Sequence, residues 1–317
     1  MNKECPSYWW TNLLFVNNFI PANAGLDRCM AWSWYLSNDM QFFMITPIIL
    51  YLYYKYARKV GWTILGLLIL CTVLCCSILV GVNDYSVVPF DDSKNGGKFD
   101  MIYNKPYCRV AAFAIGLGCG WVLYSYYRYK DTKEVFDNQA LAIAHSFTRI
   151  PVVRYVGFIL GVGLISFVIF IQHSAYADIR NGFQNWNRAE TVLFMGFDKV
   201  LYGLGLSLTL MPCLLGKFPY LIELMGAAMW APLAKISYCA YLIHILILGT
   251  MIFSAEVAWY WSPLDIAIEY IAAVVLSYAA AFVLSLCVEA PFMNIEKVLF
   301  AKKKPSTEPL LKNVGVN

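Results

Sequence analysis

The sequence predicts an all-α polytopic membrane bundle of about seven transmembrane helices. Of its 317 residues, 60% are hydrophobic and only 14% are charged, whereas soluble domains average about 45–50% apolar and about 25% charged residues. The mean hydropathy is +0.58, and long apolar runs recur along the chain. This composition excludes intrinsic disorder, a collagen and a nucleic-acid binder.

Seven runs are long enough to be membrane spans, since crossing roughly 30 Å of hydrocarbon takes about 20 apolar residues. We expect helices, because only helices and closed barrels satisfy their backbone in lipid, and the alternating pattern of barrel strands is absent from the sequence. The runs cover residues 38–57, 60–82, 107–127, 154–173, 192–215, 233–253 and 264–288.

Basic residues in the connections give the orientation, because cytoplasmic loops carry the excess of Lys and Arg. Most of the 24 basic residues fall in one alternate set of connections. We therefore expect a lumenal or extracellular segment at 1–37, a transmembrane domain at 38–288 and a cytoplasmic tail at 289–317, in an endomembrane or the plasma membrane. The cytoplasmic set comprises Lys55, Arg58, Lys59, Arg128, Lys130, Lys133, Arg149, Arg154, Lys217, Lys235, Lys297, Lys302, Lys303, Lys304 and Lys312.

Two of the ten cysteines differ from the others, most of which lie inside apolar runs. Cys5 and Cys29 belong to a polar, aromatic segment before the first span. If that segment is extracytoplasmic, its compartment permits disulfides, and we expect Cys5 and Cys29 to pair. Small-residue spacing adds two GxxxG patterns, Gly116–Gly120 and Gly157–Gly161, which favour close helix packing. The tail from Lys302 to Asn317 is short and basic, and we expect it to be disordered.

Polar side chains inside spans are expensive and therefore mark candidate sites. In PLAKISYCAYLIH, the spacing of Ser237, Tyr241 and His244 is i, i+4, i+7, so the three share one helical face. A hydroxyl, a phenol and an imidazole on one face suit binding of a polar substrate or proton transfer. A hydrogen-bonded stripe that only fixes packing is the alternative.

Four further polar residues lie at the ends of spans. Asp39 and Gln41 enter the first span, where Asp39 would also be favoured simply by the helix dipole. Arg109 begins the third span, and either reaches the lumenal interface or binds an anionic group. Glu289 ends the last span, where a contact with an Arg or with the backbone would account for it.

Several catalytic patterns do not occur in the sequence. GxSxG, HExxH, paired CxxC, Walker A and GxGxxG signatures are missing. The three histidines, His145, His173 and His244, are too few and too scattered for a metal site. We therefore expect no metal and no bound cofactor.

Four segments in order resemble the acyltransferase 3 family, and most closely its nose resistant to fluoxetine branch. They are CMAWSWYLSNDMQFFMITPIIL, KPYCRVAAFAIGLGCGWVL, PLAKISYCAYLIH and VEAPFMNIEK, and the N-terminal CPSYWWTNLLFVNNFIP is also similar to that branch. The resemblance runs from about Cys5 to Lys297. The residues that it carries over are Trp34, Tyr35, Asp39, Gln41, Arg109, Ser237, Tyr238, Tyr241, His244 and Glu289.

This resemblance implies a membrane acyltransferase that moves an acyl group from acyl-CoA to a hydroxyl of a carbohydrate or lipid-like acceptor. It also implies about ten helices, with the proposed catalytic histidine on the first. The match here begins after that helix, so we expect about three helices and their histidine to be missing from this chain. None of its histidines occupies that position, and His244 is the best candidate for a base.

Two other functions stay open from the sequence. One is a transporter, or a protein that handles lipids or drugs. The other is a truncated family member with no activity of its own. If the chain is an enzyme, its partners are membrane lipid, the acyl donor and the hydroxyl acceptor. We expect His244 and Arg109 to share a cavity open toward the lumen, with Asp39 or Gln41 near its rim and an open side where the missing helices belong.

Overall fold

The all-α polytopic fold is confirmed by a computed structural model, which describes residues 5–22, 27–87, 97–176, 186–254 and 262–300. Every one of the seven predicted runs forms a helix, and the described residues contain no strand. The chain divides into two compact units, Met1–Leu224 and Met225–Asn317. The predicted tail Lys302–Asn317 lies outside the described residues.

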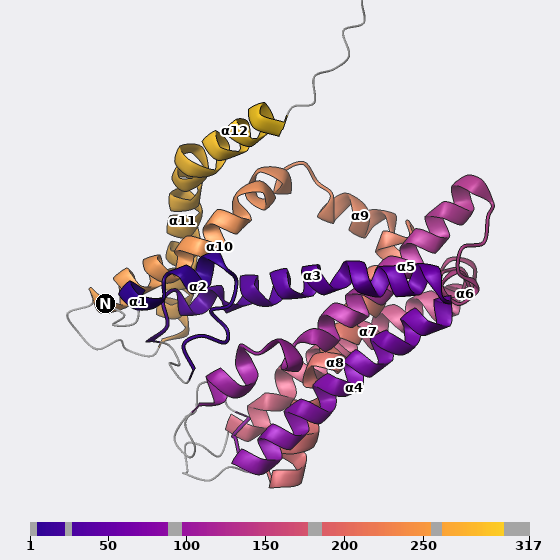
Figure 1. Ribbon diagram of the computed structural model, residues 1–317, viewed down its shortest axis with the longest axis horizontal. Coiled ribbons are helices and arrows are strands. Elements are labelled where there is room, and N and C mark those ends of the chain that lie inside the picture. The colour runs from indigo at the N-terminus through magenta and orange to yellow at the C-terminus, as the bar shows by residue number, and fades with distance from the viewer. Residues whose placement is uncertain (1–4, 23–26, 88–96, 177–185, 255–261, 301–317) are drawn as a thin grey trace, which may run out of the picture. The chain divides into compact units, whose positions relative to one another are not determined.

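The first unit combines short elements, at its start and between α4 and α5, with long helices (Figure 1). The short elements are α1 (Cys5–Tyr8), α2 (Trp10–Leu13), η2 (Ala31–Ser33), the π-helical η3 (Phe99–Tyr103) and η4 (Pro106–Cys108). The longer helices are α3 (Trp34–Lys55), α4 (Arg58–Asn83), α5 (Val110–Thr132), α6 (Asn138–Arg149), α7 (Pro151–Tyr176) and α8 (Arg188–Leu214). The short α9 (Pro219–Met225) follows them.

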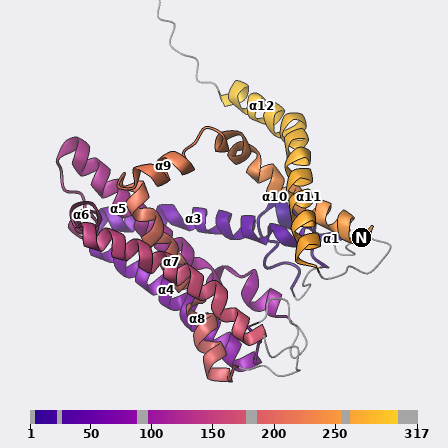
Figure 2. The ribbon, with the colours of Figure 1, turned by 180° about the vertical axis from the view of Figure 1, so that it is seen from behind.

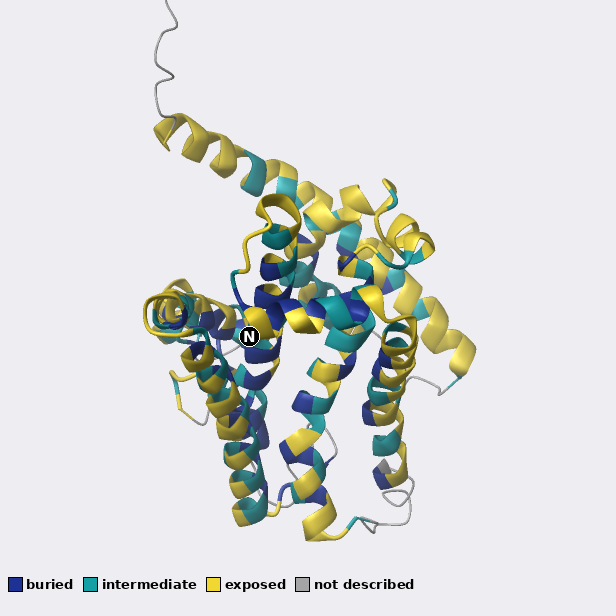
Figure 3. Cartoon of the chain, turned by 90° about the vertical axis from the view of Figure 1, so that its right-hand side faces the viewer, coloured by how far each residue is buried: buried dark blue, intermediate teal, exposed yellow. Residues whose placement is uncertain are grey.

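Helix α5 is the centre of this unit. It packs against α4, α6 and α8, while α7 packs mainly on α8, as the view from behind shows (Figure 2). Within its most apolar stretch, 44% of α5 is buried inside the protein, against 17% for α7. Much of the outer surface of these helices is exposed, as the yellow segments of Figure 3 show. Large hydrophobic residues are among the exposed ones, including Ile159, Phe167 and Phe170 of α7. A soluble protein buries such residues, so these faces fit a lipid environment.

Among the described residues, six helices are long and apolar enough to cross a membrane, one fewer than the seven expected from the sequence. They are α4, α5, α7, α8, α10 and the continuous run Pro263–Phe300. The remaining predicted span, α3, is a helix of 22 residues but is not among the six. Asn38, Asp39 and Gln41 near its start, with Lys55 at its end, lower its hydropathy. Only two residues join the end of α3 to the start of α4, and the two helices diverge from this connection (Figure 1).

Helix α6 was not predicted as an element, and one carboxylate fixes its start. Asp137 Oδ1 accepts hydrogen bonds from the backbone N–H groups of Gln139 (2.8 Å) and Ala140 (3.1 Å), which makes Asp137 the N-cap. Asp137 Oδ2 accepts from Tyr53 Oη at 2.6 Å and from Trp62 Nε1 at 3.0 Å. One buried side chain therefore ties α6 to α3 and α4.

The second unit is a pair of packed helices with an extension. It contains α10 (Trp230–Phe253) and α11 (Pro263–Leu284), which pack on each other. The π-helical turn η6 (Ser285–Glu289) and α12 (Ala290–Phe300) continue α11. Cys239, Ala240 and Ala281 form the buried contact between α10 and α11, where small side chains let the two backbones approach.

Candidate functional site

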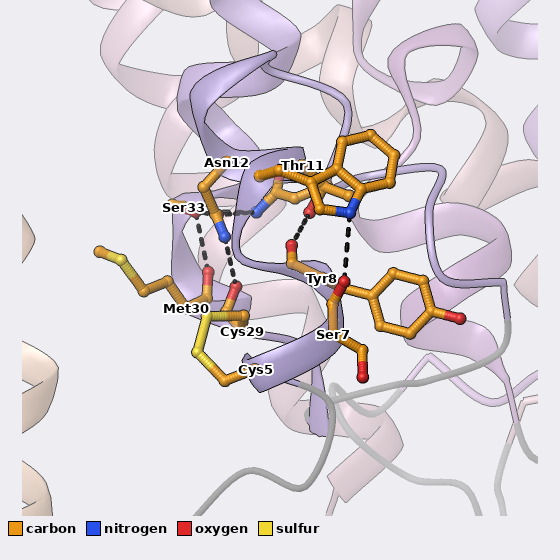
Figure 4. Close-up of a disulfide and its surroundings, with 10 residues drawn as sticks. Cys5, Ser7, Tyr8, Thr11, Asn12, Cys29, Met30 and Ser33 are labelled. Carbon is orange, nitrogen blue, oxygen red and sulfur yellow. Dashed lines mark hydrogen bonds between the residues drawn. A yellow bond between two sulfur atoms is a disulfide. The ribbon is translucent and has the colours of Figure 1, made fainter.

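A disulfide closes the N-terminal segment of the first unit. Cys5 and Cys29, the pair named from the sequence, are bonded, with their Cα atoms 4.3 Å apart. Asn12 Nδ2 donates to the carbonyl of Cys29 at 3.1 Å, and Ser33 Oγ donates to Asn12 Oδ1 at 2.7 Å (Figure 4). The disulfide thus holds a loop whose interior is polar rather than apolar.

Buried asparagine side chains hydrogen-bond the N-terminal segment to residues at the start of α3. Asn17 Nδ2 donates to Ser33 Oγ at 2.7 Å, and Ser37 Oγ donates to Asn17 Oδ1 at 2.5 Å. Beside them, Asn18 Nδ2 donates to Asn38 Oδ1 at 2.7 Å. Asn17 and Asn18 are at most 1% exposed. Because buried amides are costly unless bonded, this network fixes how the segment sits on α3.

Gln41 is part of this network, and Asp39 is not. Gln41 Nε2 donates to the Phe15 carbonyl at 2.9 Å and to Asn18 Oδ1 at 3.0 Å. Asp39, two residues earlier, is exposed. Their spacing puts the two on different sides of α3, so the structure separates a pair that the sequence analysis treats together.

A buried ion pair completes the polar region and was not predicted. Arg28 Nη2 lies 2.6 Å from Asp100 Oδ1, and the two side chains are only 1% and 3% exposed. Arg28 also donates to the Asn17 carbonyl. Nothing in the sequence marked this pair, because 72 residues separate its members. Burial, followed by the nearby positive charge of Arg28, lowers the pKa of Lys105, which donates to the carbonyl of Asn18.

Arg109 packs against two aromatic rings that also contact each other, with centroids 5.1 Å apart. Its guanidinium carbon is 5.0 Å from the centroid of the Trp34 ring and 4.7 Å from that of Tyr103. Arg109 Nε donates to the Tyr103 carbonyl at 2.9 Å. Among the described ion pairs none includes Arg109. Cation–π contact therefore accounts for its position at the start of α5.

The second unit contains the groove that carries most of the chemistry expected from the sequence. Ser237, Tyr241 and His244 of α10 line one hollow of about 330 Å³, as their shared face predicts. Facing them from α11 are Tyr270, Ser277 and Tyr278. The remaining lining is apolar. We call this hollow the α10–α11 groove.

His244 is oriented by its own helix. Its Nδ1 lies 2.6 Å from the carbonyl oxygen of Tyr241. A carbonyl can only accept, so Nδ1 carries the hydrogen, and in the neutral ring Nε2 is then the free acceptor. The Tyr241 and His244 rings lie 5.7 Å apart between centroids. This arrangement suits a base.

Tyr238 and Glu289 line a different hollow, of about 500 Å³, between α10 and the continuous run of α11, η6 and α12. Glu289 Oε2 accepts from Ser285 Oγ at 2.7 Å and from Cys239 Sγ at 3.2 Å. Glu289 is thus held by neutral donors, rather than by the Arg or backbone contact that the sequence analysis named as the ordinary explanation. It belongs to η6, a π-helical turn of the kind often found at functional sites.

The predicted cavity shared by His244 and Arg109 stays a prediction. Arg109 belongs to the first compact unit and His244 to the second. For metals, the described residues hold no group of three or more His, Cys, Asp or Glu side chains suited to an ion.

Comparison with known proteins gives two similar proteins of Caenorhabditis elegans. Nose resistant to fluoxetine protein 6 is 27% identical over 312 residues, which cover 95% of this chain and 36% of that protein. The resemblance to the nose resistant to fluoxetine proteins is confirmed. Regulator of hypoxia-inducible factor 1 is 28% identical over 138 residues, covering 37% of this chain and 26% of that protein.

This chain thus spans 36% and 26% of the lengths of these two relatives. No family model matches the sequence, and no solved structure matches it. The chain is accordingly a multi-pass membrane protein similar to nose resistant to fluoxetine protein 6.

Proposed function

We propose that this chain is part of a membrane acyltransferase, which moves an acyl group from acyl-CoA to a hydroxyl of a carbohydrate or lipid-like acceptor. The motif resemblance suggests the reaction. The observation that carries it is His244, whose Nδ1 is held by the Tyr241 carbonyl in a groove lined by hydroxyls.

The chemistry assigned to the groove is general base catalysis. His244 Nε2 takes the proton of the acceptor hydroxyl as its oxygen attacks the thioester carbonyl. The C–S bond then breaks, and the imidazolium returns the proton to the departing thiolate. The bond to Tyr241 fixes the tautomer in which Nε2 is the acceptor of the neutral ring, and it stabilises the imidazolium that forms, because the carbonyl accepts from Nδ1–H in both forms.

The test is acyl transfer from a radiolabelled long-chain acyl-CoA in membranes that contain the chain. General base catalysis contributes about 10²–10⁴-fold, so H244A should lower turnover by about a hundredfold or more. His173 lies at the end of α7 in the other unit, and H173A is the matched control that should retain turnover. Equal turnover in H244A and the wild type would remove His244 from the reaction.

A second function, handling of small lipophilic molecules, is favoured by an apolar cavity in the first unit. This cavity has a volume of about 350 Å³ and lies among α4, α5, α6 and α8. Trp62, Cys119 and Phe147 are among its lining residues, and Ser207 is one of its few polar ones. Its size and apolar lining are typical of a small-molecule site.

This second function is tested separately from acyl transfer. Gly66 lines the apolar cavity, and a Cβ placed there would meet no described atom within 4 Å. G66L should therefore fill the cavity without a clash and abolish binding of a lipophilic amine such as fluoxetine. If acyl transfer stays normal in G66L while binding is lost, the two functions use different sites. Unchanged binding would exclude this cavity.

A further inference from the structure

A second, strongly basic cavity lies at one end of the first unit. Its volume is about 260 Å³, and it is formed by the C-terminal ends of α5 and α6 and by Lys217, three residues after the end of α8. We call it the basic cavity. Its lining includes Tyr129, Lys130, Lys133, His145, Arg149 and Lys217.

The positive charges of the basic cavity have no carboxylate partner in the described part of the chain. No acidic residue lines the cavity, and none of its four Lys and Arg residues takes part in a described ion pair. Arg128, one residue before this group on α5, is by contrast paired with Glu134 at 3.0 Å. The unpaired charges therefore gather at the cavity and not along the helix as a whole.

The remaining groups of the cavity add neutral donors. Burial, and then the charge of Arg149, lower the pKa of His145, which favours the neutral ring and limits the repulsion among the cations. The rings of Tyr129 and His145 meet edge to face, with centroids 5.6 Å apart. Lys133 Nζ is 5.8 Å from the centroid of the Tyr129 ring. Aromatic contacts thus hold the cavity wall.

Helix dipoles explain only part of this arrangement. A cation in the last turn of each helix is favoured by about 0.3–1 kcal/mol, and α5, α6 and α8 all end here. That effect requires each cation only to be near its own helix end. It gives no reason for four of them to line one hollow, where like charges repel in the absence of an anion.

We propose that the basic cavity binds a ligand carrying clustered phosphate groups. Arg and Lys are the side chains best suited to phosphate oxygens, and Thr148, which also lines the cavity, supplies a hydroxyl. Two sources carry this chemistry: the nucleotide part of coenzyme A, reaching the cavity from the cytoplasm, and a polyphosphoinositide headgroup in the inner leaflet. The positive-inside rule puts this end of the unit on the cytoplasmic side.

The apolar cavity described above lies on the same face of α5. Cys119 and Val122 line the apolar cavity, and Tyr126, Tyr129 and Lys133 line the basic one. Steps of three or four residues keep Cys119, Val122, Tyr126 and Tyr129 on one stripe of α5, and Lys133 directly follows the last residue of that helix. A molecule with a phosphate-rich head and an apolar tail fits this order. The proposal concerns binding only and does not depend on acyl transfer.

The experiment is a titration of the purified full chain in detergent with coenzyme A, and separately with dioctanoyl phosphatidylinositol bisphosphate. We expect K130Q/K133Q to weaken binding of at least one probe by about tenfold or more, since about 1.4 kcal/mol corresponds to a tenfold change. K217Q, which removes a single half-buried charge, is a milder second variant. K55Q/K59Q is the matched control, because these lysines belong to the same predicted side and do not line the cavity.

The two probes distinguish the sources. Weaker binding of dephospho-coenzyme A than of coenzyme A supports the nucleotide part of coenzyme A as the ligand. Binding of the phosphoinositide but not of dioctanoyl phosphatidylcholine supports the lipid headgroup. The proposal is overturned if neither probe binds, or if K55Q/K59Q weakens binding as much as K130Q/K133Q. Failure of acyl transfer with phosphate binding intact would count against the proposed function alone.

Discussion

At the scale of single residues, Asp137 shows how one carboxylate organises a helix end in this protein. Its two oxygens accept four hydrogen bonds, two from side chains and two from backbone amides. Burial raises the pKa of Asp137, but the bonds from Tyr53, Ala140, Trp62 and Gln139 outweigh it, and the pKa is lowered overall. Asp137 is therefore an ionised acceptor in the folded state.

We predict that D137N destabilises the first unit by about 1–3 kcal/mol, the cost of leaving a buried polar group unsatisfied. The amide has one acceptor oxygen where the carboxylate has two, and the N–H of Trp62 cannot be turned into an acceptor. Thermal unfolding in detergent would measure this loss. D131N, at an exposed position on the last turn of α5, is the control and should unfold like the wild type.

The pH dependence of stability should follow the same group. Because the folded pKa of Asp137 lies below its unfolded value, its contribution is present above the unfolded pKa and lost as pH falls through the folded pKa. Wild-type unfolding temperatures should therefore drop on acidification below the ordinary Asp range. D137N should lack this component. Identical pH profiles for the two proteins would contradict the assignment.

Helical periodicity indicates which residues of one helix lie together, and it does so only for residues near each other in the chain. The shared face of Ser237, Tyr241 and His244 follows from helical periodicity alone. The partners of Gln41 could not be predicted, because Phe15 and Asn18 belong to an irregular segment whose path is set by the disulfide and the buried amides. Arg28–Asp100 was missed for the same reason.

At the scale of elements, the length and apolarity that lipid requires make the long helices predictable from the sequence, whereas α6 was not predicted. A span requires a run of about 20 apolar residues, which is visible in any hydropathy profile. Helix α6 has 12 residues and is amphipathic, so it falls below that length. Its signal was an N-cap Asp followed by buried Leu141, Ala144 and Phe147 at helical spacing.

Helix contacts also show which of the two GxxxG patterns matters. A Cβ on Gly161 of α7 would lie 2.7 Å from the Gly205 carbonyl oxygen of α8, whereas a Cβ on Gly116 or Gly120 would meet no described atom within 4 Å. Sequence spacing cannot tell these cases apart, because it does not say which face of a helix meets a neighbour. Only Gly157–Gly161 lies at a close helix contact.

We predict that G161A destabilises the α7–α8 pair by about 1–3 kcal/mol, the usual cost of overpacking. The clash is with backbone, which cannot move aside as a flexible side chain can. G116A is the matched control, and its stability should stay the same or rise slightly, because Ala favours the helix over Gly. The measurement is the unfolding temperature of each variant in the same detergent. A G161A protein as stable as G116A would contradict the close contact between Gly161 of α7 and Gly205 of α8.

At the scale of the whole molecule, the disulfide favours an oxidising compartment for the N-terminal segment. The N-terminal segment is held by buried amides and by the Cys5–Cys29 bond, and such bonds persist only where conditions are oxidising. The same segment precedes α3, at the end that the charge distribution assigns to the lumen. Two independent arguments, one from redox chemistry and one from loop charges, thus favour the same side.

We predict that the double variant C5S/C29S lowers stability by about 3 kcal/mol, the value expected for a closed loop of this size. The separation along the chain is 24 residues. Non-reducing mass spectrometry of the wild-type protein should recover a peptide containing both cysteines. Recovery of free thiols at both positions would place the segment on the reducing side.

Both ends of α4 provide the sharpest test of topology. This helix has 26 residues, and at about 1.5 Å per residue it is about 39 Å long, enough to cross the hydrocarbon core. Lys59 stands near its first residue and Asp84 follows its last, and both are exposed. We predict that a membrane-impermeant maleimide applied from the lumenal or extracellular side labels D84C and leaves K59C unlabelled until the membrane is permeabilised. The unsubstituted chain is the control for its eight other free cysteines. The reverse pattern would invert the orientation and move the basic cavity to the lumenal side, out of reach of cytoplasmic coenzyme A.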